Sequence, residues 1–144
     1  MAALDRERKT QKMGENTVVD LLPPYPMKAG VKGFLGGIAV LSGGFLAPAT
    51  VATGLIAVGI FEMTVDNTTG KDGDAQGRIR QGTFPFFNSG GADTIAQVDV
   101  GKDCFLIDDQ TVAKTDGGGA RSRAGKIMGV RDDGMVWVQL GIGL

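Results

Sequence analysis

The chain has 144 residues, of which 24 are glycine, one is cysteine and none is histidine, and its formal net charge is −1. A nearly neutral chain has no bulk field that would attract nucleic acid or an anionic membrane, so neither is an expected partner. Without histidine, an enzyme would have to use Asp, Glu, Lys or Ser for its acid and base chemistry. The composition therefore favours a protein that is not an enzyme, needs no cofactor and binds another protein or a small polar ligand.

Residues 1–32 differ in composition from the rest, and we expect them to form an extended N-terminal arm before a β-rich domain over residues 33–144. Pro23, Pro24 and Pro26 hold the second half of this arm extended. Apolar side chains among prolines suit the groove of a partner, although an idle tail is the alternative. The arm residues predicted to bind a partner are Leu21, Leu22, Tyr25 and Met27.

Residues 33–61 carry no charged side chain and are numerous enough to span a membrane as a helix. Turn-forming residues interrupt the stretch at Gly36-Gly37, at Ser42-Gly43-Gly44 and at Pro48. These interruptions divide it into pieces of strand length, so buried strands are preferred to a membrane helix.

Apolar or alternating runs bounded by turn residues predict a series of short strands along the chain. These runs cover residues 37–41, 55–65, 77–87, 102–107, 111–114, 126–131 and 135–140. Asp132-Asp133-Gly134 separates the last two runs and is a strong hairpin signal, because Asp and Gly tolerate the positive φ angles of tight turns.

The last predicted strand is apolar on both faces, because Met135, Trp137 and Gln139 alternate with valines and a leucine. A second apolar face suggests cover by the arm or by a second subunit, so Trp137 is a further predicted partner-binding residue. No segment shows a sustained helical stripe. The expected fold class is all-β, with a single β-sandwich or jelly-roll-like domain and an extended N-terminal arm.

The glycine-rich segment 117–126 invites comparison with a phosphate-binding loop. The comparison fails because Ala120 replaces the first glycine of the motif and Ile127 replaces its magnesium-binding hydroxyl residue. A connecting loop is the better interpretation. Arg121 and Arg123 in this loop either pair with acidic groups on a partner or are solvated.

Other polar motifs also fall short of a catalytic or metal site. Asp72-Gly73-Asp74 imitates the start of a calcium loop, but Thr83 stands where the bidentate Glu is required. The adjacent carboxylates Asp108-Asp109 and Asp132-Asp133 lie at predicted turns, where exposure should leave their pKa values untuned. Cys104 lies in an apolar run and is expected to be a buried packing residue; a single cysteine permits a reducing compartment.

The order of these features along the chain is more specific than any single one. The segments that carry the order are GIAVL at 37–41, SGGF at 42–45, PAT at 48–50, AVGI at 57–60, VDN at 65–67, GKDGD at 70–74, RIRQG at 78–82, VGK at 100–102, DDQTV at 108–112 and GVRDDGMVWV at 129–138. Over roughly residues 28–140 this order resembles the small capsid cement, or head decoration, proteins of tailed bacteriophages.

The resemblance implies a virion structural protein that is made in the host cytoplasm and binds the outer surface of the phage head. Its implied partners are the major capsid protein, whose subunit contacts it would stabilise, and itself, as a homodimer in preference to a trimer. The alternatives are a small β-rich enzyme using Asp and Lys, or a module associated with a tail or fibre. A carboxylate with a raised pKa inside a pocket would favour the enzyme, and an extended apolar footprint with an ordered arm would favour the cement protein.

Overall fold

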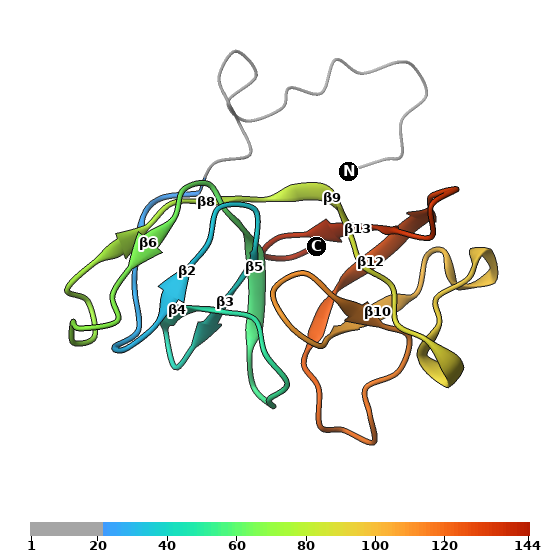
Figure 1. Ribbon diagram of the computed structural model, residues 1–144, viewed down its shortest axis with the longest axis horizontal. Coiled ribbons are helices and arrows are strands. Elements are labelled where there is room, and N and C mark those ends of the chain that lie inside the picture. The colour runs from blue at the N-terminus through green and yellow to red at the C-terminus, as the bar shows by residue number, and fades with distance from the viewer. Residues whose placement is uncertain (1–21) are drawn as a thin grey trace, which may run out of the picture.

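The computed structural model describes residues 22–144, and in this part of the chain the fold is all-β, as predicted (Figure 1). Apart from the strands there are two 3₁₀ helices of three residues each, η1 (Gly91–Asp93) and η2 (Gln97–Asp99). Neither helix could cross a membrane, and residues 22–144 contain no other helix.

A four-stranded antiparallel sheet with the order β4-β3-β5-β8 forms most of the N-terminal half. Its strands are β3 (Ile38–Ser42), β4 (Phe45–Pro48), β5 (Ile56–Phe61) and β8 (Ile79–Arg80). Two shorter pairs lie beside it, β1 (Tyr25–Pro26) with β7 (Gln76–Gly77) and β2 (Lys32–Gly33) with β6 (Val65–Asp66).

A five-stranded antiparallel sheet with the order β11-β10-β12-β13-β9 forms the C-terminal half, drawn mainly from yellow to red in Figure 1. Its strands are β9 (Gly82–Phe86), β10 (Asp103–Leu106), β11 (Val112–Ala113), β12 (Arg123–Val130) and β13 (Val136–Leu140). Phe87 links the two edges, because its N–H donates to Gln110 and its carbonyl accepts from Val112. The sheet therefore curls, and its two edge strands, β11 and β9, are joined through Phe87.

The hydrophobic core has two parts, one on each face of the four-stranded sheet. Ile38 and Val40 point toward the curled sheet and pack with Leu106, Ile127 and the other inward residues of that sheet. The intervening Ala39 points to the opposite side, where the second cluster is formed by residues Met27, Ala39, Leu46, Val58, Phe61 and Ile79. Because successive side chains of a strand point to opposite faces of the sheet, β3 contributes residues to both clusters.

Residues 22–28, which fall within the predicted arm, form a strap across the four-stranded sheet. The expected arm covered residues 1–32, but its last eleven residues belong to the folded domain, and residues 1–21 lie outside the described part of the chain. Backbone bonds attach the strap to strands at both edges of the sheet. They run from Leu22 N–H to the Ile79 carbonyl (2.9 Å), from Met27 N–H to Ala75 (2.8 Å) and from Lys28 N–H to Leu46 (2.8 Å).

The predicted strands are present with altered ends. The predicted hairpin at Asp132-Asp133-Gly134 joins β12 to β13, and Gly134 has the positive φ expected of it, +87°. The run 55–65 ends as a strand at Phe61 and resumes as β6, and the run 77–87 is divided among β7, β8 and β9. The prediction missed β4, whose Pro48 marks the end of the strand.

Candidate interaction surface

Three of the four arm residues predicted to bind a partner, Leu22, Tyr25 and Met27, contact this chain's own domain. Met27 is fully buried in the second core cluster. Leu22 and Tyr25 are half-buried and pack against the same cluster. Leu21 lies outside the described residues.

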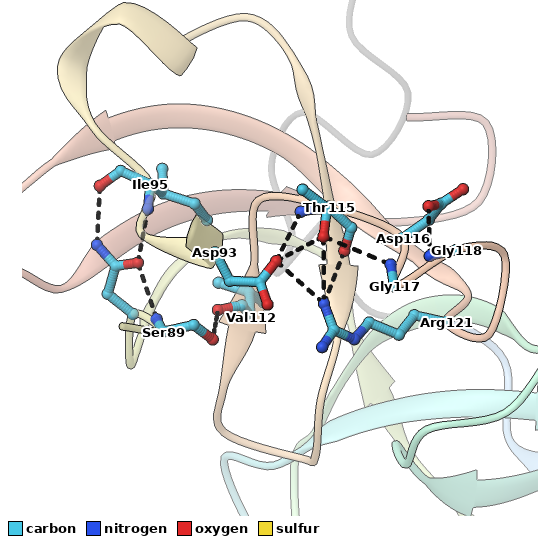
Figure 2. A network of polar contacts seen from close by, with 10 residues as sticks. Ser89, Asp93, Ile95, Val112, Thr115, Asp116, Gly117, Gly118 and Arg121 are labelled. Carbon is cyan, nitrogen blue, oxygen red and sulfur yellow. Dashed lines mark hydrogen bonds and ion pairs between the residues drawn. The ribbon is translucent and has the colours of Figure 1, made fainter. Parts of the chain in front are cut away.

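Arg121 forms an ion pair and hydrogen bonds within the chain (Figure 2). Its guanidinium lies 3.2 Å from the Asp93 carboxylate and donates to the Thr115 carbonyl at 3.0 Å. Hydrogen bonds from Thr115 and the ion pair with Arg121 hold the pKa of Asp93 below its usual value. These contacts fasten the glycine-rich loop to the segment around η1.

Arg123 and Trp137 remain partly accessible on the curled sheet. Arg123 pairs with Asp103 at 2.8 Å and donates to the Leu144 carbonyl at 2.7 Å. Trp137 is 37% exposed on the outer side of β13, and the Arg131 guanidinium lies 5.5 Å from its ring centre. The inward residues of the same strand are buried, so only the outer face of β13 is left for a partner.

Among residues 22–144, the most exposed pair of adjacent large apolar side chains lies in the turn between β2 and β3. Phe34 is 53% and Leu35 is 66% exposed, although the backbone around them is tightly held. The turn requires Gly36, whose φ of +85° is unfavourable for residues with a Cβ. Its hydrogen bonds run from Leu35 N–H to Thr64 Oγ1 (3.0 Å), from Gly36 N–H to the Phe61 carbonyl (2.9 Å) and from Gly37 N–H to the Phe34 carbonyl (2.9 Å).

A hollow of about 420 Å³ separates this turn from the loop between β10 and β11. Its lining residues are Phe34, Leu35, Gly36, Gly37, Asp109 and Gln110. A hydrogen bond of 2.8 Å from Ile38 N–H to the Asp109 carbonyl joins the start of β3 to the loop between β10 and β11. The hollow therefore lies at the junction of the two sheets, and we call it the Phe34–Asp109 hollow.

Asp109 is half-buried in this hollow, which corrects the prediction that both carboxylates of the Asp108-Asp109 pair have untuned pKa values. Burial raises the pKa of Asp109, and the neighbouring Asp108 carboxylate adds to the increase. Within residues 22–144, no other side chain donates a hydrogen bond to the Asp109 carboxylate, and none forms an ion pair with it. Asp108, by contrast, accepts the Gln110 N–H at 2.9 Å.

Sequence reasoning missed this site because its parts are far apart along the chain. Phe34 and Leu35 stand between glycines and fit no strand pattern, which was the available signal for an exposed apolar turn. Nothing in the local sequence around Asp109 indicates that this turn would face it, because the closeness of the two loops follows from the packing of one sheet against the other.

Within residues 22–144, neither the candidate nucleophile Cys104 nor the possible metal ligands form a further functional site. No group of three or more Cys, Asp or Glu side chains there is placed to hold a metal ion. Cys104 is buried as predicted, and burial raises the pKa of its thiol to about 12. Comparison of the chain with known protein families, curated proteins and solved structures finds no match.

Proposed function

We propose that this protein is a capsid cement protein that binds the outer surface of a tailed phage head and stabilises contacts between major capsid protein subunits. The order of strand and turn motifs supports the proposal, and the observation that carries it is the rigid turn that exposes Phe34 and Leu35. Exposed apolar side chains on a fixed backbone lose little conformational entropy when a partner covers them. The two packed sheets serve as a sandwich-like scaffold for this turn.

The proposed action is mechanical. A protein that binds only the assembled shell stabilises that shell by linkage, since its binding free energy is absent from the dissociated subunits. Contact with two neighbouring capsid subunits at once strengthens the effect, because the second contact forms at high effective concentration.

Co-sedimentation with phage heads tests the proposal directly. Expanded heads of the encoding phage, stripped of this protein, should bind the purified chain, and the double variant Phe34→Ser, Leu35→Ser should bind more weakly. Val98→Ser is the matched control, because Val98 is 75% exposed but lies on η2, away from the turn. Failure of the unaltered protein to bind such heads would overturn the proposal and leave the enzyme and the tail or fibre module as alternatives.

We also propose self-association as a homodimer, in preference to a trimer, through the outer face of β13. Trp137 is the partly exposed aromatic residue of this face, and aromatic residues commonly dominate protein interfaces. Sedimentation velocity at micromolar concentration should give about twice the chain mass of 14.9 kDa, and Trp137→Ser should shift the protein toward monomer. A stable monomer for the unaltered protein would contradict association before capsid binding.

One observation favours the enzyme as a second candidate: Asp109 has a raised pKa and lines a hollow. General acid–base catalysis by two groups needs a second titratable side chain facing the same space. Within the described residues, Asp109 is the one titratable residue that lines this hollow. The cement protein therefore remains the function that the arrangement supports better.

A further inference from the structure

Within residues 22–144, no basic side chain forms an ion pair with the Asp109 carboxylate. Arg121, Arg123 and Arg131 each pair with another aspartate, and none of the ion pairs within residues 22–144 includes Asp109. Within residues 22–144, the one charged neighbour that affects the pKa of Asp109 is another carboxylate, Asp108. A half-buried anion beside a second anion is electrostatically unfavourable until a cation approaches it.

The surroundings of Asp109 suit the apolar stem of a long basic side chain. The hollow is bounded on one side by Phe34 and Leu35, and its volume of about 420 Å³ exceeds that of a single side chain. Lys and Arg commonly lay their methylene groups along apolar surface while the charged group reaches a polar partner. The Phe34 ring already has a cation beside it, because Lys32 Nζ lies 5.0 Å from the ring centre.

We propose that the Phe34–Asp109 hollow receives one lysine or arginine side chain of a partner protein, whose cationic group pairs with the Asp109 carboxylate while its stem covers Phe34 and Leu35. The identity of the partner as the major capsid protein rests on the proposed function. The hollow is poorly suited to a bound Ca²⁺ ion, because that ion takes six to eight oxygen ligands and Asp109 is the one carboxylate among residues 22–144 that lines this space.

Nuclear magnetic resonance of the full chain tests the hollow without any capsid. The probe is N-acetyl-arginine methylamide at millimolar concentration, and its neutral analogue N-acetyl-citrulline methylamide is the control. The arginine probe should shift the amide signals of Gly36, Gly37 and Gln110 in a saturable manner, and Asp109→Asn should abolish the response. Equal shifts with the citrulline analogue, no shifts at all, or unchanged shifts in Asp109→Asn would each overturn the proposal.

Binding to stripped phage heads then separates this inference from the proposed function. Asp109→Asn should weaken head binding about tenfold, as expected for the loss of one partly buried charge pair. Asp132→Asn is the matched control, because Asp132 is exposed in the turn between β12 and β13 and should leave binding unchanged. If the unaltered protein binds heads and Asp109→Asn binds equally well, this inference is wrong while the cement function stands.

Discussion

Truncation of Met27 to alanine should destabilise the domain strongly, because the strap that carries it is part of the core. The Met27 side chain has no exposed surface and packs in the cluster formed with Leu46, Phe61 and Ile79. Substitution of a fully buried Met by Ala removes apolar contacts and leaves a cavity, which costs about 2–5 kcal/mol. For a domain of this size, we expect a fall in the melting temperature of about 10 °C.

Thermal unfolding followed by circular dichroism measures this effect, with urea unfolding as a second assay. Leu35→Ala is the control, since Leu35 is 66% exposed and its truncation should change the stability by less than about 0.5 kcal/mol. Deletion of residues 1–21 leaves the strap intact, so the shortened chain should fold, whereas deletion of residues 1–27 removes Met27 and should prevent stable folding. A melting temperature for Met27→Ala equal to that of Leu35→Ala would refute the role of the strap in the core.

Three further predictions concern the curled sheet. Gly134→Val should destabilise the protein by roughly 1 kcal/mol or more, because Gly134 has a φ of +87°, and an unchanged melting temperature would contradict this. Cys104, whose thiol pKa is about 12, should react with a thiol reagent only after unfolding, and rapid labelling of the native protein would contradict its burial. Hydrogen bonds from Lys126 and Arg123 lower the pKa of Asp103, so Asp103 adds stability above its ordinary pKa of 3.8 and loses that contribution as the pH falls through its lowered value. The stability deficit of Asp103→Asn, expected to be below about 1 kcal/mol because the site is partly exposed, should therefore shrink in acid; a deficit that is constant with pH would contradict this.

The contribution of Asp109 to the stability of the fold changes with pH in the opposite direction from that of Asp103. Burial raises the pKa of Asp109, so the folded state binds its proton more tightly than the unfolded state does. Ionisation of Asp109 therefore lowers stability as the pH rises through the raised value. Asp109→Asn should melt slightly above the unaltered protein at pH 7, and this difference should vanish below pH 3.8; a variant less stable at pH 7 would contradict the assignment.

Sequence alone was sufficient for the features that depend on neighbouring residues. The hairpin at Asp132-Asp133-Gly134 was predictable because positive φ is a property of the residue itself, and the strand in 37–41 because apolar residues were bounded by glycines. The burial of Cys104 followed in the same way from its apolar run. The strands near Pro48 and Pro85 were harder to place. The effect of a proline on a strand depends on whether that strand lies at the edge of a sheet, which the local sequence does not show.

The contacts of the predicted partner-binding residues depended on segments far away in the chain. The prolines correctly indicated an extended segment around Met27, but only the folded structure shows that this segment crosses its own sheet instead of remaining free. Arg121 meets Asp93 for the same reason, because η1 and the glycine-rich loop are distant in the sequence and lie together only in the folded structure.

The sequence by itself determined that this chain forms short strands joined by tight turns, since φ preferences and two-residue alternation act over a few residues. Only the tertiary structure decided that Phe34 and Leu35 line the same hollow as the half-buried Asp109 carboxylate. The physical reason is that burial and electrostatic pairing depend on distances in space. Those distances are set when both faces of the four-stranded sheet are covered at once.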